Sequence, residues 1–190
     1  KNYQALEPDL KDELAKLEGN DEALEDAFYA PMEFGTAGMR GVIGAGINRM
    51  NVYTVRQATE GLASLMDTLD EETKRRGVAI SYDSRHKSQE FAFESARVLG
   101  AHGIPSFVFE SLRPTPELSF TVRHLHAYAG IMITASHNPK QYNGYKIYGE
   151  DGAQMPLKES DLITKYIREV DDIFAVEAAD KDALINDGTL

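Results

Sequence analysis

One serine of this chain, Ser136, stands where a reactive hydroxyl group would be accessible. It follows the apolar segment 129–134, which has the composition of a buried strand. Pro139 and the Asn-Gly pair at 143–144 then force turns, so Lys146 can return toward Ser136 on the next extended segment. Open α/β sheets bind their ligands beyond the carboxyl ends of strands, and the pattern therefore predicts a functional site at Ser136. The alternative is an ordinary polar surface loop.

Serine-hydrolase chemistry does not fit the surroundings of Ser136. The G-x-S-x-G pattern is absent, because the residues two positions away are Thr134 and Asn138. His137 is adjacent in sequence, and we expect its ring to point away from the Ser136 hydroxyl. Thiol catalysis, disulfides and zinc–thiolate sites are excluded because the chain has 0 cysteines.

A second candidate is the glycine-dense stretch 35–46, which holds 5 of the 15 glycines. It is either a flexible turn or a loop whose backbone N–H groups approach a phosphate, with Arg40 as a bidentate donor. Gly44-Ala-Gly46 lacks the third glycine of a dinucleotide fingerprint, and no G-x-x-x-x-G-K-S/T loop occurs. Asp83-Ser-Arg85 also has two interpretations. Taken alone, an ion pair at a strand end is favoured over a phosphate contact.

The elements that must position these residues alternate between strands and helices. Strands are expected at 77–82, 104–109, 129–134 and 145–148, and helices at 1–30, 51–69, 88–102, 116–126 and 157–170. Asn51 is the expected cap of the second helix, and Gly103 is the expected stop of the third. We therefore expect the α/β class, as a three-layer α/β/α domain around a mixed sheet of about four strands. Residues 171–190 form a tail or linker.

The composition is that of one soluble globular domain. The 190 residues are 42% hydrophobic and carry a net charge of −11. The acidic balance argues against nucleic-acid binding, and no apolar run reaches the roughly 20 residues of a membrane helix. The chain begins at Lys1 without an initiator Met or a signal-peptide core, so we expect it to be part of a longer polypeptide. The absence of cysteine is compatible with a reducing intracellular compartment, and we expect a cytoplasmic protein.

Four motifs together carry a specific resemblance. Thr134-Ala-Ser-His-Asn-Pro139, followed by Tyr142-Asn-Gly-Tyr-Lys146, resembles the active-serine loop of the α-D-phosphohexomutases. Phe34-Gly-Thr-Ala-Gly-Met-Arg-Gly41 is similar to the N-terminal arginine loop of that family. Tyr82-Asp-Ser-Arg85 and Arg113-Pro-Thr-Pro116 follow in the family's order. Segments 33–40 and 148–153 most resemble the cytosolic phosphoglucomutase branch, which also includes phosphopentomutase-like members.

The resemblance implies that the 190 residues are the first of four domains of an enzyme that moves phosphate between C1 and C6 of a hexose. Ser136 would be the phosphoserine, and its phosphoryl oxygen a ligand of Mg²⁺. Lys146 is the candidate general acid/base, and Arg40 would lie near the transferring phosphate. A phosphoserine carries about −1.5 to −2 charge, which these cations would balance. The resemblance also implies a catalytic role for His137, beside Ser136, Lys146 and Arg40. The implied substrate-binding residues are Arg40, Ser136, His137, Asn138, Lys146 and Arg85.

One departure from the family pattern is large. Its magnesium loop, Asp-Gly-Asp-x-Asp, is absent, and neither Asp151-Gly-Ala-Gln nor Asp187-Gly-Thr matches it. Its sugar-recognition loop and C-terminal phosphate clamp are also missing, so we expect the 190 residues alone to be inactive.

The expected parent enzyme is a phosphoglucomutase that interconverts glucose 1-phosphate and glucose 6-phosphate. The resemblance implies Mg²⁺ as cofactor, glucose 1,6-bisphosphate as activator, and a hexose phosphate and the remaining domains as partners. The alternatives are a sister mutase for mannose, glucosamine or pentose phosphates, and a non-catalytic module that binds sugar phosphates.

Overall fold

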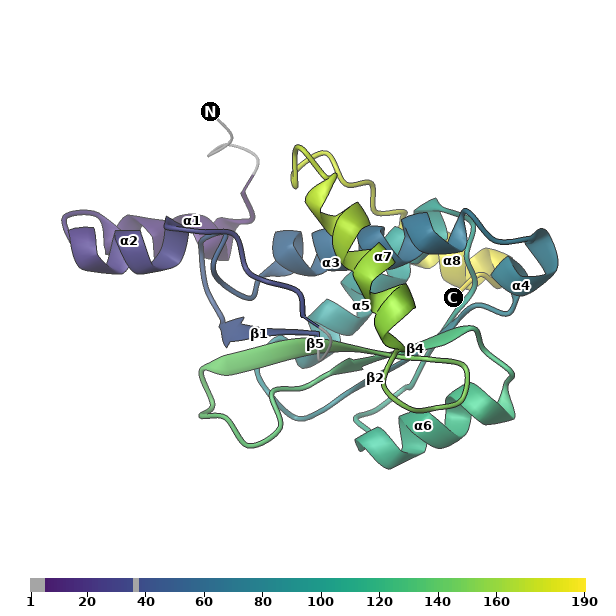
Figure 1. Cartoon of the computed structure of the whole chain (residues 1–190). Helices are drawn as coiled ribbons and strands as arrows, with labels where there is room; N and C mark the ends of the chain where they lie inside the picture. The colour runs from purple at the N-terminus through teal and green to yellow at the C-terminus, as the bar shows by residue number, and fades with distance from the viewer. Residues whose placement is uncertain (1–5, 36–37) are drawn as a thin grey trace.

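The chain folds around a five-stranded sheet with the order β1-β5-β4-β2-β3 (Figure 1). The structure is a computed structural model that describes residues 6–35 and 38–190. Its strands are β1 Met39–Val42, β2 Val78–Tyr82, β3 Ser106–Val108, β4 Ala129–Ile133 and β5 Tyr142–Tyr148. Its helices are α1 Pro8–Leu17, α2 Asp21–Phe28, α3 Val52–Met66, α4 Glu71–Arg75, α5 Ser88–Ala101, α6 Thr115–His124, α7 Leu157–Arg168 and α8 Lys181–Asp187.

The sheet is mixed, which confirms the expected α/β class. β2 runs parallel to β3 and β4, whereas β5 is antiparallel to both β4 and β1. The expected number of about four strands is too low because β1 lies inside the glycine-dense stretch, where we predicted only a turn or loop. β1 is an edge strand, and its Gly41 leaves room for Met32, whose Cε would lie 2.6 Å from a Cβ at that position. β5 also begins earlier than expected, at Tyr142.

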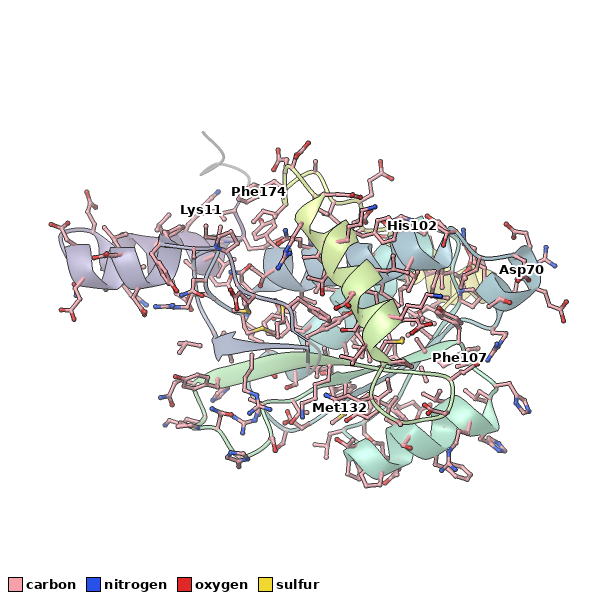
Figure 2. The ribbon with its side chains drawn as sticks, in the orientation of Figure 1. Lys11, Asp70, His102, Phe107, Met132 and Phe174 are labelled. Atoms are coloured by element: carbon pink, nitrogen blue, oxygen red, sulfur yellow. The ribbon has the colours of Figure 1, made fainter. Side chains whose placement is uncertain are left out.

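Helices cover both faces of the sheet and complete the three layers. Figure 1 shows α3, α5 and α7 over one face and α6 under the other. Ile80 and Ile131 belong to the main core beneath α3 and α5. Ala79 and Met132 point to the opposite face and form a smaller core with Leu118 of α6 (Figure 2). The continuous apolar character of β2 and β4 follows from this burial on both sides.

The predicted single helix over 1–30 is wrong. Within the described part of this range the chain forms two helices, α1 and α2, because Gly19 adopts a left-handed φ of +81° between them. The side-chain oxygen of Asn20 then accepts a hydrogen bond from the Ala23 N–H at 3.1 Å and starts α2. Residues 1–5 lie outside the described residues.

Other helix boundaries follow their predicted signals closely. Asn51 caps α3 in a reciprocal capping box with Thr54, and Gly103, at φ +67°, follows the end of α5. The tail 171–190 contains α8, whose Leu184 packs on Gly100 of α5. The short helix α4 was not predicted. Among the residues described, no helix has the length and apolar character needed to cross a membrane.

Candidate functional site

Ser136 lies immediately beyond the carboxyl end of β4 with its side chain exposed. Its backbone φ is +56°, in the left-handed region that costs an ordinary residue about 1–2 kcal/mol. The Ser136 N–H donates to Thr134 Oγ1 at 2.9 Å, and the Thr134 N–H donates to the Gly144 carbonyl of β5 at 3.0 Å. We call residues 134–142 the serine loop. Its contacts with β5 hold Ser136 in a conformation that the serine would rarely adopt by itself.

Arg40 is brought to the serine loop by the pairing of β1 with β5. It lies opposite Gly144 in the antiparallel register, and its Nη1 donates to Asn138 Oδ1 at 2.7 Å. Gly38, just before β1, has a φ of +89°, and a Cβ there would lie 2.0 Å from the Tyr145 carbonyl oxygen. Glycine is therefore required for this close approach. Thr36 and Ala37 of the arginine motif lie outside the described residues.

Lys146 lies on β5 opposite Met132 of β4, so both side chains leave the same face of the sheet. The Lys146 side chain is half-buried. Burial lowers the pKa of its ammonium group below the ordinary value of 10.5, and the positive charge of Arg40 lowers it further. A lysine with a lowered pKa can exchange a proton more readily near neutral pH, which suits a general acid/base.

The Arg85 guanidinium is directed into the serine loop. It donates hydrogen bonds to four of the loop's carbonyl groups, those of Ser136, Asn138, Pro139 and Tyr142. Its Nε also lies 3.3 Å from Asp83 Oδ2, which confirms the ion pair favoured for this segment. A contact of Arg85 with substrate stays a prediction. The hydrogen bonds to the loop carbonyls favour a role in holding the serine loop.

His137 does not point away from Ser136 as we expected. Its Nδ1 lies 3.5 Å from Ser136 Oγ, at the outer limit of a hydrogen bond. Both side chains are exposed. Among the described residues no carboxylate is hydrogen-bonded to His137, so the orienting third member of a hydrolase triad is missing. Asn138 links the serine loop to Arg40, and its predicted role in substrate binding stays a prediction.

Sequence reasoning missed the structural role of Asn143. We treated it only as a turn residue, but it is fully buried on β5. Its Nδ2 donates to the His86 carbonyl at 3.0 Å and to Ser88 Oγ at 2.9 Å. Local sequence did not indicate these contacts of Asn143, because both partners lie more than fifty residues away in the chain.

A polar cavity of about 390 Å³ opens beside Ser136. This volume is within the range of small-molecule sites. Besides Ser136 and Asn138, the cavity is lined by two cationic or titratable side chains that we had not singled out, His86 and Lys140, together with Asp83, Ser84 and Arg85.

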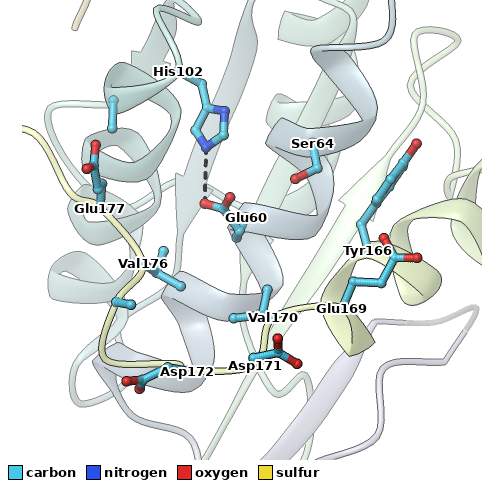
Figure 3. Close-up of a pocket in the computed structure, with 12 residues that line it drawn as sticks. Glu60, Ser64, His102, Tyr166, Glu169, Val170, Asp171, Asp172, Val176 and Glu177 are labelled. Atoms are coloured by element: carbon cyan, nitrogen blue, oxygen red, sulfur yellow. Dashed lines mark hydrogen bonds and ion pairs between the residues drawn. The ribbon is translucent and has the colours of Figure 1, made fainter.

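A larger cavity of about 470 Å³ shares no residue with the one at Ser136 (Figure 3). Its walls include Glu60, Glu169 and Glu177, which would repel a phosphate. His102 on this wall lies 3.1 Å from Glu60 Oε2 and 2.6 Å from Asp67 Oδ2. The hydrogen bond to Glu60, together with Asp67, raises the pKa of His102 to about 9. This cluster joins α3 to the end of α5.

The described residues do not form a magnesium site. Among them, no group of three or more His, Cys, Asp or Glu side chains could hold a metal ion. Asp83, the carboxylate that lines the cavity at Ser136, already accepts hydrogen bonds from Ser88 and from the Arg85 backbone N–H. A Ser136 phosphoryl oxygen as a metal ligand stays a prediction.

The model of the phosphoglucomutase/phosphomannomutase alpha/beta/alpha domain I matches residues 31–173. The chain belongs to this family. The phosphoglucomutase of Staphylococcus aureus strain bovine RF122 / ET3-1 is 47% identical over 152 residues, which are 80% of this chain and 27% of that protein. The phosphohexomutase domain thus spans about a quarter of the length of the curated relatives it matches.

Solved structures of the same family share the fold. A putative phosphomannomutase from Thermus thermophilus is 33% identical with a TM-score of 0.66, covering 79% of this chain and 32% of that one. Parafusin, a phosphoglucomutase from Paramecium, has 22% identity and a TM-score of 0.58, with 78% and 26% covered. The matched segment 31–173 contains the serine loop, Arg40 and Lys146, and it excludes α1 and α2.

Proposed function

We propose that this chain is the phosphate-carrying domain of a phosphoglucomutase, with Ser136 as the carrier. The observation that supports this most directly is the exposed Ser136 hydroxyl, fixed on a left-handed backbone in a loop that Arg40 contacts. Relatives named phosphoglucomutase support glucose phosphate as the substrate. A mannose phosphate is the second candidate, because a related structure 33% identical is titled a putative phosphomannomutase.

In the proposed reaction the phosphoryl group moves from Ser136 to a free hydroxyl of glucose 1-phosphate. The Oγ–P bond breaks, a new P–O bond forms at the sugar, and the sugar hydroxyl loses a proton while the Ser136 oxygen gains one. Glucose 1,6-bisphosphate is the intermediate, and return of its other phosphoryl group to Ser136 gives glucose 6-phosphate. Arg40 would stabilise the charge on the transferring group.

Lys146 is the proposed group that accepts or returns the proton. Its lowered pKa makes the neutral form more accessible than for an exposed lysine. His137 and Asn138 would shape the loop around the phosphate, as their places beside Ser136 and Arg40 suggest. Because the described residues do not form a magnesium site, we derive no step through Mg²⁺, and a role for the metal stays a prediction.

The remaining parts of the site would come from other domains of a longer polypeptide. The chain spans 27% of the related phosphoglucomutase from Staphylococcus aureus. The family resemblance implies only one metal ligand from this chain, an oxygen on Ser136. We therefore expect no turnover of glucose 1-phosphate by the 190 residues alone. Rapid conversion of glucose 1-phosphate by the 190 residues alone would contradict the proposal that other domains complete the site. The cytoplasmic location stays a prediction.

The test is transfer of label from ³²P-labelled glucose 1,6-bisphosphate to the longer protein, followed by mapping of the labelled residue. Label on Ser136 supports the proposal, and Ser136→Ala should take up none and lose nearly all turnover while folding normally. Label on Ser84 or Thr134 instead would overturn the assignment. Comparing kcat/KM for glucose, mannose, glucosamine and pentose phosphates then separates the sister activities. Binding of these sugar phosphates without any labelling would point to a non-catalytic module.

A further inference from the structure

Near Ser136, the guanidinium of Arg85 forms several hydrogen bonds with the serine loop, and its side chain is 14% exposed. Its Nη1 donates to the Pro139 and Tyr142 carbonyls at 2.9 and 3.1 Å. Its Nη2 donates to the Ser136 and Asn138 carbonyls at 2.8 and 2.7 Å. One guanidinium thus closes the serine loop on itself, from its reactive residue to the first residue of β5.

The four Nη donors of Arg85 have partners within the chain. A guanidinium has five N–H donors in a planar fork. The four Nη hydrogens match the four carbonyl contacts, and Nε faces Asp83 at 3.3 Å. No Nη donor is left over for a substrate phosphate. This arrangement differs from the substrate-binding role that the resemblance implied for Arg85.

Arg85 is itself held by a partly buried chain of polar groups that joins three elements. Asp83 Oδ1, at the end of β2, accepts from the Arg85 N–H at 3.0 Å and from Ser88 Oγ at 2.7 Å. Ser88 is fully buried at the start of α5, and Asn143 of β5 donates to it at 2.9 Å. The position of the guanidinium is therefore fixed by β2, α5 and β5 together.

We propose that Arg85 is a positioning residue that keeps Ser136 in the conformation able to accept and donate a phosphoryl group. The left-handed backbone of Ser136 is unfavourable locally, so it needs support from outside the loop. Arg85 also turns four carbonyl oxygens toward itself, and these partial negative charges would otherwise be free to face a phosphoserine dianion. The inference rests on the proposed function, since it assigns Arg85 a part in the same reaction.

The first experiment tests the support of the loop without any assay of activity. Amide hydrogen exchange is measured by NMR on the 190-residue chain, wild type against Arg85→Ala. We expect at least 10-fold faster exchange in the variant at the bonded amides of the loop, those of Ser136, Asn138 and Tyr142. The matched control is Arg76→Ala, because Arg76 also donates to two carbonyls and pairs with a carboxylate, away from this loop. It should leave these amides unchanged.

The second experiment measures phosphoryl transfer in the longer protein. Arg85→Ala should slow labelling of Ser136 about 100-fold and lower kcat by a similar factor, while KM for glucose 1-phosphate changes less than 2-fold. Arg85→Lys keeps the charge but not the fork, so it should recover only part of the rate. Arg76→Ala should label at the wild-type rate.

The outcomes separate this inference from the proposed function. A rise in KM with unchanged kcat would assign Arg85 to substrate binding and overturn the inference, as would unchanged exchange in Arg85→Ala. Faster exchange with normal labelling would also overturn it, because the support would then have no part in the reaction. If wild-type Ser136 takes up no label at all, the proposed function fails, and with it the part of Arg85 in the reaction, although the exchange result still decides whether Arg85 holds the loop.

Discussion

The left-handed backbone of Ser136 makes an unusual prediction about stability. Replacing Ser136 by glycine or by alanine removes the hydroxyl in both cases, so both variants should fail equally as phosphate carriers. They should differ in folding free energy, because glycine adopts a φ of +56° without steric cost and alanine does not. The Ser136 hydroxyl has one marginal contact, with His137 at 3.5 Å, and its loss is common to both variants.

The size of the difference follows from two opposing effects. A left-handed conformation costs alanine about 1–2 kcal/mol, which glycine avoids. Glycine loses about 0.5–1 kcal/mol more conformational entropy on folding. From the midpoints of these two effects, Ser136→Gly should be more stable than Ser136→Ala by about 0.8 kcal/mol. For a chain of this length, such a difference corresponds to about 1–4 °C in Tm.

Ser84 offers a matched control on the same side of the molecule. It is exposed like Ser136, but it is not among the described residues with positive φ. Glycine has no steric advantage there, so Ser84→Gly should be less stable than Ser84→Ala by about 0.5–1 kcal/mol. Urea unfolding of the four variants at equal m value measures both differences. If alanine proves at least as stable as glycine at position 136, the argument from backbone strain is refuted.

Three further changes test the site and its supports. Arg40→Ala in the longer protein should lower kcat/KM about 100-fold, a loss of about 2.7 kcal/mol of transition-state stabilisation, and should leave Tm unchanged. Normal kinetics with a much lower Tm would show instead that Arg40 has a structural role. Gly38→Ala should lower the free energy of unfolding by about 2 kcal/mol or more, because its Cβ would meet the Tyr145 carbonyl. Gly103→Ala, in open space at φ +67°, should lower it by only about 1 kcal/mol. Equal losses of the two variants on urea unfolding would contradict this explanation. His102 has a folded-state pKa of about 9, above its ordinary 6.5, so its contribution is complete below about pH 6.5 and is lost as the pH rises through 9. His102→Gln should thus lose about 1–2 kcal/mol at pH 6 and much less at pH 10, and a pH-independent loss in urea titrations would refute the ionic account.

The sequence predicted the layers of this fold because they depend on patterns that are local. The apolar runs of β2 and β4 and the caps at Asn51 and Gly103 are each encoded within a few residues. β1 was not predicted, because it depends on a contact that is distant in sequence. Its glycine-dense sequence has little strand propensity, and it is a strand only because β5 pairs with it across about a hundred residues of chain. The same pairing brings Arg40 to Asn138, a contact that neither the local patterns nor the resemblance had predicted.

The backbone of Ser136 and the role of Arg85 could not be predicted from local pattern, and the two failures have one cause. A left-handed position is normally signalled by glycine or asparagine, but the proposed role of phosphate carrier requires a hydroxyl at this position. Local preference and chemistry therefore conflict at this residue, and such conflicts are expected where a protein has a function to perform. The conformation has to be supported by groups distant in sequence, and the four Nη donors of Arg85 are the proposed support. An arginine in the sequence cannot reveal whether its donors face a ligand or its own chain, because that depends on where four carbonyl groups of another loop come to lie.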